Sequence, residues 1–263
     1  MKKNLLSIGI MLSMSVSAFG WGQKGHDVTA YIAEQHLTPA AKAAVEDLYD
    51  GKSLVYWANW PDNACHTPEY AYTKTWHYRN IDAGNDYDVF PRNENGDVTT
   101  AIKQQYAVLA DPNASKEDKK LALILLVHFC GDIHQPMHMG HLSDLGGNQV
   151  HLKFFGKNTN LHSIWDSGVL ESGHAWSHTE WANQIDRISK EEAAQIISSA
   201  DPDDWGKECF GYATRIYDTT PAGSELSYDY VAEWTPLIEQ QLLKGGYRLA
   251  DLLNTLFDPN YTK

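Results

Sequence analysis

The stretch "LALILLVHFCGDIHQPMH", residues 121–138, decides how the interior of this protein is built. Its first half places apolar residues on every face of a predicted helix, which begins at Ser115 with Asp118 in capping-box register. A helix that is apolar all round belongs at the centre of a domain. His128 and Asp132 then stand one turn apart at the end of its most apolar segment, where each must be solvated or paired. The stretch therefore predicts a central helix whose end carries a binding site.

The rest of the chain is predicted to be mostly helical. Helical spacing covers residues 25–37, and residues 38–51 begin with an N-cap threonine and end at a glycine. Long helices are also predicted from residue 189 through residue 257, with Pro236 as a kink or a boundary. Only residues 148–160, "NQVHLKFFGKNTN", alternate like a strand around a glycine-containing turn. With no repeat and no Gly/Ser linker, the sequence predicts one compact, mainly α-helical domain with a small β-hairpin.

The first twenty residues, "MKKNLLSIGIMLSMSVSAFG", have the anatomy of a secretory signal peptide. Two lysines precede an apolar run of roughly ten residues, which is shorter than the 18–20 that a membrane span needs. Cleavage after residue 20 would make Trp21 the new N-terminus. We therefore expect a signal peptide over residues 1–20 and a soluble domain over residues 21–263, located in the periplasm or secreted.

The chain is acidic, with a formal net charge of −13 that becomes −15 once Lys2 and Lys3 are removed with the signal peptide. A protein of this charge repels nucleic acid at long range, which argues against a conventional basic-groove binder. A polyanionic substrate would therefore need a local cationic centre.

The three cysteines, Cys65, Cys130 and Cys209, form neither a CxxC motif nor a dense disulfide framework. Cys130 lies inside the apolar helix and is expected to be a small buried hydrophobic residue. The spacing leaves a disulfide between Cys65 and Cys209 open.

Two segments contain a histidine followed four residues later by an aspartate: His128 with Asp132, and His162 with Asp166. On a helix, side chains at this spacing leave the same face and can converge on one cation. A single such pair is more often a hydrogen-bonded surface pair. Here further candidates accumulate nearby, namely His26, Asp62, His77 and His138. This mixture of imidazole and carboxylate suits Zn²⁺ better than Ca²⁺ or Mg²⁺, and the lack of a thiolate cluster favours a catalytic zinc site.

Several motifs together resemble the zinc-dependent single-strand-specific nucleases, the S-one/P-one nuclease family. The resemblance covers the chain from Trp21 to about residue 170. It rests on six motifs in the family's order and spacing, which are "WGQKGH" (21–26), "WANWPD" (57–62), "WHYRNI" (76–81), "HFCGDIHQPMH" (128–138), "DLGGN" (144–148) and "NLHSIWDSG" (160–168).

The resemblance implies a phospholipase C/nuclease-like helical fold with three zinc ions. One zinc would be bound by Asp62, His77 and His128. Asp132 would bridge it to a second zinc, held by His26 and by the amino group and carbonyl oxygen of Trp21. The third would be bound by His138, His162 and Asp166.

The resemblance also implies the chemistry, in which a hydroxide bridging two zinc ions attacks phosphorus, with Asp62 and Asp132 as the catalytic carboxylates. Single-stranded DNA and RNA would be cut to 5′-phosphate nucleotides, and mononucleotides would lose a 3′-phosphate. Tyr78 would stack on the base and Asn80 would bind the base edge, where the family often has an aspartate. We expect no membrane association, no stable protein partner and a monomer.

Other residues have more ordinary interpretations. His134 is expected to be structural or to support the ligands, and Asp144 and Asn148 to orient ligands or shape their loop. Two rival functions stay open, which are a zinc-dependent phospholipase C of the same fold and a zinc-binding protein without turnover.

Overall fold

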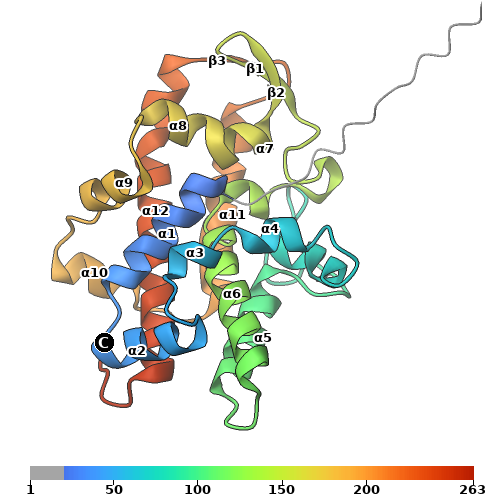
Figure 1. The fold of residues 1–263 in the computed structure, drawn as a ribbon. Helices are drawn as coiled ribbons and strands as arrows, with labels where there is room; N and C mark the ends of the chain where they lie inside the picture. The colour runs from blue at the N-terminus through green and yellow to red at the C-terminus, as the bar shows by residue number, and fades with distance from the viewer. Residues whose placement is uncertain (1–20) are drawn as a thin grey trace, which may run out of the picture.

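The computed structural model describes residues 21–263, so the predicted signal peptide lies outside the described residues. This part of the chain is mainly α-helical, as predicted (Figure 1). Its helices are α1 (Gln23–Gln35), α2 (Pro39–Leu48), α3 (Leu54–Trp57), α4 (Trp60–Ala64), α5 (Val98–Ala110), α6 (Lys116–Asp132), α7 (Leu161–Ser163), α8 (Val169–Gly173), α9 (His178–Ile185), α10 (Lys190–Ile196), α11 (Pro202–Thr219) and α12 (Tyr228–Phe257). Short 3₁₀ helices are η1 (Ala71–His77), η2 (Pro136–Met139) and η3 (Leu142–Asp144), and η4 (Ile164–Gly168) is a π-helical turn.

Helix α6 is the central helix of the domain, as the sequence predicts. The side chain of Ser115 accepts a hydrogen bond from the Asp118 amide at 3.1 Å and starts the helix. Every residue from Ala122 to Asp132 is buried. Helix α6 packs along α5 and also contacts α1 and α12, and α1 in turn packs along α12. The polar end of α6 is therefore enclosed by the core.

The first two predicted helices are also present, as α1 and α2. The Thr38 hydroxyl caps α2 by accepting the Ala41 amide at 3.2 Å. Gly51, at φ +78°, donates its amide to the Glu46 carbonyl at 2.8 Å just after the helix. The sequence signals for the start and stop of this helix are confirmed.

The predicted hairpin is formed by β1 (His151–Phe154) and β2 (Lys157–Asn160), which pair antiparallel with His151 opposite Asn160. Phe155 and Gly156 form its turn, both at positive φ. A third strand that the sequence did not predict, β3 (Glu225–Leu226), pairs parallel with β1. Within the predicted helical stretch 189–257, α10 and α11 are present, and the last helix begins only at Tyr228, after β3. The three strands lie together at one end of the molecule (Figure 1).

Helix α12 continues through Pro236, so the proline is not a helix boundary. Pro236 has no N–H to donate to the Ala232 carbonyl, and the Thr235 hydroxyl donates to the neighbouring Val231 carbonyl at 2.7 Å. Packing of α12 against α1, α6 and α8 outweighs the local effect of the proline. Within residues 21–263, no helix is both long enough and apolar enough to cross a membrane.

All three cysteines are free and buried, so the Cys65–Cys209 disulfide that the spacing left open is not formed. Burial raises the pKa of the Cys65 thiol to about 11. Cys130 lies in the interior of α6, as expected for a small hydrophobic residue.

Replacing a central α6 side chain should destabilise the domain far more than replacing an exposed one. Leu126 is fully buried, so Leu126→Ala should lower the free energy of unfolding by about 2–5 kcal/mol. The exposed Glu117 on the same helix provides the control, and Glu117→Ala should change it by no more than about 0.5 kcal/mol. Urea unfolding followed by circular dichroism measures both. Equal losses in the two variants would contradict the central position of α6.

Candidate metal centre

The fold brings together eight side chains that the sequence singled out as candidate ligands. All are buried, with relative exposures of 8% or less. They come from elements spread along the chain, namely His26 (α1), Asp62 (α4), His77 (η1), His128 and Asp132 (α6), His138 (η2), His162 (α7) and Asp166 (η4).

One group of three ligand atoms has the spacing of a zinc site. His77 Nδ1 lies 3.1 Å from His128 Nε2 and 3.6 Å from Asp62 Oδ1, and His128 Nε2 lies 3.2 Å from Asp62 Oδ1. Tetrahedral zinc with ligands at 2.0–2.1 Å requires them to be about 3.3 Å apart. These three atoms could therefore hold one ion with little movement.

Asp132 has its two oxygens directed at different neighbours. Oδ2 lies 3.1 Å from His77 Nδ1 and 3.2 Å from His128 Nε2. Oδ1 lies 3.4 Å from His26 Nε2. The imidazole of His26 stacks on that of His128, with ring centroids 4.0 Å apart. A carboxylate in this arrangement can bridge two ions.

A further group is formed by His138, His162 and Asp166, each of which offers one ligand atom within 4.8 Å of the others. His162 Nε2 lies 3.4 Å from Asp166 Oδ2. The sequence analysis expected this pair on one face of a regular helix, but the pair spans α7 and the π-helical turn η4. In that turn the Val169 amide donates to the Ile164 carbonyl, five residues back. The two side chains still converge.

Backbone carbonyls orient three of the histidines. The Nδ1–H groups of His128, His138 and His162 donate to the carbonyls of Ala58 (2.7 Å), His77 (2.5 Å) and Gly146 (2.6 Å), respectively. Because Nδ1 of each ring donates to a carbonyl, Nε2 is the nitrogen that can bind a metal once it has lost its proton. Sequence analysis did not identify these carbonyl partners, because a backbone carbonyl has no signature in the sequence.

Gln135 is a supporting residue that the sequence analysis missed. Its amide nitrogen donates to Asp166 Oδ1, and its amide oxygen accepts the Met137 amide at 2.5 Å. The side chain is fully buried between the candidate ligands of α6 and η2. A polar residue within "DIHQPMH" was the only signal in the sequence that could have indicated this role.

The electrostatics of the cluster suit the binding of cations. In the described part of the chain, the ion-pair partners of Asp62, Asp132 and Asp166 are histidines alone, with no lysine or arginine among them. Both oxygens of Asp132 and both ring nitrogens of His26 are buried without a hydrogen-bond partner. Buried polar groups of this kind are rarely left unsatisfied in proteins. The donor set fits divalent zinc, whose charge would balance that of the aspartates.

The pKa values of three cluster side chains are shifted by burial and by neighbouring charges. Burial raises the pKa of Asp166 well above its ordinary value, against the lowering effect of Gln135. Burial also opposes ionisation of Asp132, but the charges of His128 and His138 bring its pKa well below the ordinary value. Burial lowers the pKa of His26.

The beginning of the described chain lies beside this cluster. The Gly22 amide donates to the Asp166 carbonyl at 2.7 Å, and the Trp21 side chain is fully buried. Asp62 and Asp166 face an open hollow of about 320 Å³ next to this segment. Its other lining residues are uncharged, namely Gly22, Gln23, Asn59, Asn63, Ser163 and Ser167. A substrate could reach the cluster from this side.

The two predicted base-binding residues do not line that hollow. Tyr78 follows His77 directly and is half-buried, which raises the pKa of its hydroxyl. Asn80 has a buried side-chain oxygen without a hydrogen-bond partner, and it lies against Gly146 at φ +66°. A Cβ at Gly146 would lie 2.6 Å from the Met137 carbonyl, so this close approach requires glycine.

The contacts of His134, Asp144 and Asn148 agree with the structural or supporting roles expected for them. His134 donates from Nδ1 to the Cys130 carbonyl at 2.7 Å and accepts from Arg248 at 2.9 Å, and it is absent from the candidate ligand groups. Asp144 accepts the Gly147 amide at 2.7 Å, and Asn148 donates to the Leu145 carbonyl at 2.9 Å. These two contacts shape the loop whose Gly146 carbonyl orients His162.

The architecture defines a class of protein: a mainly helical domain that encloses a histidine and aspartate cluster suited to metal. Comparison with known proteins identifies the family. A family model described as "S1/P1 Nuclease" matches residues 21–258, and the chain belongs to this family.

Known relatives align with nearly the whole chain. Endonuclease 2 of Arabidopsis thaliana is 30% identical over 281 residues, which cover 94% of this chain and 94% of that protein. Nuclease S1 of Aspergillus oryzae is 29% identical, covering 93% of this chain and 94% of that protein. Nuclease P1 of Penicillium citrinum is also 29% identical, covering 92% of this chain and 100% of that protein.

The absence of a side chain at Gly131 leaves room for the His26 ring, and filling this room should weaken metal binding. A Cβ on Gly131 would lie 2.6 Å from His26 Nδ1, so Gly131→Ala should displace the ring and reduce bound zinc per chain by about one ion. Gly211→Ala is the control, because a Cβ there meets nothing within 4 Å. Elemental analysis of the purified variants measures both. Unchanged zinc in Gly131→Ala would show that His26 is not a ligand.

Proposed function

We propose that this protein is an exported zinc-dependent phosphodiesterase that hydrolyses single-stranded DNA and RNA to 5′-phosphate nucleotides and removes 3′-phosphates from mononucleotides. The observation that carries the proposal is the buried cluster of three aspartates and five histidines, which has no lysine or arginine as an ion-pair partner within residues 21–263. Membership of the S1/P1 nuclease family and the names of the relatives support the same function.

Three zinc ions would be held by the side chains described above. Asp62, His77 and His128 would hold the first, and Asp132 would bridge it to a second beside His26. Spacings of 3.1–3.6 Å within the first group and 3.4 Å between Asp132 and His26 support this division. The third ion would be held by the other group, His138, His162 and Asp166.

The second ion would take its remaining ligands from Trp21. Cleavage before this residue would create an α-amino group, and its carbonyl would lie next to it. The hydrogen bond between the Gly22 amide and the Asp166 carbonyl supports this role, because it holds the start of the domain at the cluster. We propose that signal-peptide cleavage is therefore required for a complete site.

Bound zinc would supply a water of lowered pKa and would neutralise negative charge on the phosphate. The protein's own contribution is to hold its ligands in position. The carbonyls of Ala58, His77 and Gly146 orient three imidazoles, and Gln135 orients Asp166. Asp62 and Asp132 would act as the catalytic carboxylates, and the hollow at Asp62 would admit the phosphodiester.

Tyr78 and Asn80 would bind the base of the substrate. Stacking on an aromatic ring requires the base to be outside a duplex, which would favour single strands. Asn80 offers both a donor and an acceptor, whereas an aspartate offers acceptors alone, so tolerance of several bases is expected.

The proposal is tested by zinc stoichiometry and hydrolysis measured on one purified, N-terminally sequenced sample. We expect about three zinc ions per chain, Trp21 at the N-terminus, and cleavage of single-stranded DNA and RNA that stops after chelation. Three ions with activity only on phospholipids would identify a phospholipase C instead. Zinc without hydrolysis of either substrate would identify a binding protein without turnover.

Removing the bridging carboxylate should have an effect on more than one ion. Asp132→Ala should lose at least two zinc ions and lower kcat/KM by more than about 100-fold, which exceeds the effect expected for a supporting residue. The exposed Asp218 provides the control, and Asp218→Ala should leave both quantities unchanged. Near-normal zinc content in Asp132→Ala would refute the bridging assignment.

Loss of the stacking ring should weaken substrate binding without loss of metal. Tyr78→Ala should raise KM for single-stranded DNA by roughly 5- to 150-fold, the equivalent of about 1–3 kcal/mol. Tyr78→Phe keeps the ring and should bind nearly as well as the original protein. A fall in zinc content in Tyr78→Ala would instead place this residue in the metal centre.

A further inference from the structure

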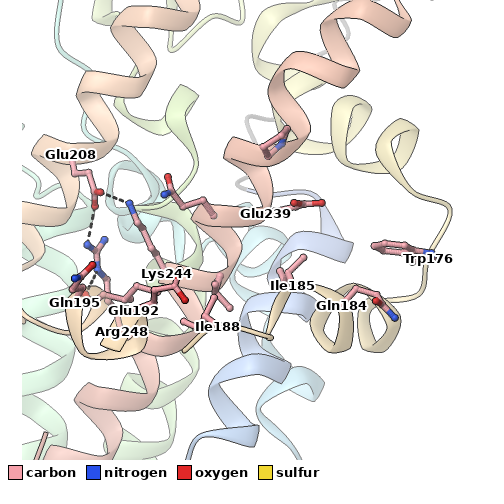
Figure 2. Close-up of a pocket in the computed structure, with 14 residues that line it drawn as sticks. Trp176, Gln184, Ile185, Ile188, Glu192, Gln195, Glu208, Glu239, Lys244 and Arg248 are labelled. Atoms are coloured by element: carbon pink, nitrogen blue, oxygen red, sulfur yellow. Dashed lines mark hydrogen bonds and ion pairs between the residues drawn. The ribbon is translucent and has the colours of Figure 1, made fainter. Parts of the chain in front are cut away.

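A network of charged side chains links α11 and α12 outside the candidate ligand groups. Figure 2 shows the cavity of about 750 Å³ that these side chains line, with Glu208 of α11 in contact with both Lys244 and Arg248 of α12. The two cations are only 9% and 8% exposed. Charges that are largely buried are normally held by specific partners, and the partners of these two cations differ.

The guanidinium of Arg248 connects three segments of the chain. Its Nε donates to the Ile196 carbonyl at the end of α10 at 3.2 Å, and one terminal nitrogen donates to Glu208 at 2.8 Å. The other terminal nitrogen donates to Nε2 of His134, which directly follows the end of α6, at 2.9 Å. Arg248 therefore joins the charged network to the end of the central helix.

The contacts of His134 fix its tautomer. The side chain is 1% exposed, so both ring nitrogens need partners within the protein. An arginine offers donors alone, so Nε2 of His134 must be an acceptor. The ring proton is therefore on Nδ1, which donates to the Cys130 carbonyl at 2.7 Å. Without Arg248, nothing would prevent the Nε2–H tautomer, which cannot donate to this carbonyl.

The bond from His134 closes the end of α6. The Cys130 carbonyl is among the last four carbonyls of this helix, which lack amide partners within it. The His134 amide, which would bind Cys130 in a longer helix, donates instead to the Gly131 carbonyl at 3.0 Å. The imidazole supplies the donor that the backbone does not, and it holds the chain as it leaves the helix.

This turn lies between candidate metal ligands. Asp132 is the last residue of α6, and the Gln135 amide donates to its carbonyl at 2.9 Å. The Gln135 side chain donates in turn to Asp166. A shift of His134 would therefore move a ligand of one candidate group and the support of a ligand in the other.

We propose that Arg248 is a positioning residue for the metal centre. It acts through His134, whose imidazole it holds in the tautomer that closes α6, and it thereby sets the directions of the Asp132 carboxylate and the Gln135 amide. This inference rests on the proposed metal centre. It gives Arg248 a role that pairing with Glu208 alone would not require.

The network itself provides a matched control. Arg248→Met and Lys244→Met each remove a largely buried charge from α12, and each leaves Glu208 with one cation. Among the described residues, Lys244 donates to Glu208 and Tyr212 alone. A role in stability alone would affect both variants alike, whereas positioning of the metal centre requires Arg248.

The first measurement is the tautomer of His134, from long-range proton–nitrogen correlation NMR with the signals assigned by their loss in His134→Gln. We expect Nδ1–H in the original protein and in Lys244→Met, and a measurable fraction of Nε2–H in Arg248→Met. The second measurement is zinc affinity, by competition with a chromophoric chelator. Arg248→Met should bind zinc roughly tenfold more weakly, and Lys244→Met should stay within about twofold of the original protein, because only the former loses support for the ligands.

Arg248→Lys tests the same link if Arg248→Met fails to fold. It keeps a positive charge for Glu208 but has one nitrogen in place of the planar fork, so it should also lose zinc affinity. An unchanged His134 tautomer in the folded Arg248 variant, or equal losses of zinc affinity in the two methionine variants, would overturn the proposal. Neither measurement uses hydrolysis. Zinc binding that depends on Arg248 in a protein inactive on nucleic acid would support this role and refute the proposed nuclease function alone.

Discussion

The constraint on which the structure depends is the burial of three aspartates whose ion-pair partners, within the described residues, include no lysine or arginine. Asp62, Asp132 and Asp166 meet only histidines within ion-pair distance in the described chain. An arrangement of this kind would be strongly unfavourable in an ordinary apolar core. Binding of the proposed divalent ions would offset this cost, and the free energy of binding would then contribute to the stability of the folded state.

The fold places the candidate ligands from several short segments around the buried end of one apolar helix, α6. Helix α6 presents His128 and Asp132 from a fully buried stretch, so their positions are set by core packing. The segment around His77 connects the candidate groups, because its imidazole faces Asp132 while its carbonyl orients His138. A displacement of this segment would therefore move ligand atoms in the group that contains Asp132 and in the group that contains His138. Rigid support of this kind is what an active site needs for precise positioning.

The sequence predicted the central helix, the hairpin and the two His/Asp pairs, because each has a local signature in periodicity, turn residues or spacing. The grouping of His26, Asp62, His77 and His138 with those pairs rested instead on the resemblance to the nuclease family. It did not predict β3, whose pairing with β1 joins residues more than seventy positions apart. It left Pro236 open as a boundary, whereas long-range packing of α12 keeps the helix intact. Gln135 and the carbonyls of Ala58, His77 and Gly146 were not identified, since such contacts exist only after the chain has folded.

The π-helical turn η4 has a consequence for the helix that follows it. A π turn holds an extra residue compared with an α-helical turn, and such turns are frequent at functional sites. Because each residue of an α-helix turns the chain by roughly 100°, one extra residue rotates α8 about its axis by that amount relative to a continuous α-helix. The face of α8 that packs against α12 is therefore set independently of the face on which His162 and Asp166 converge.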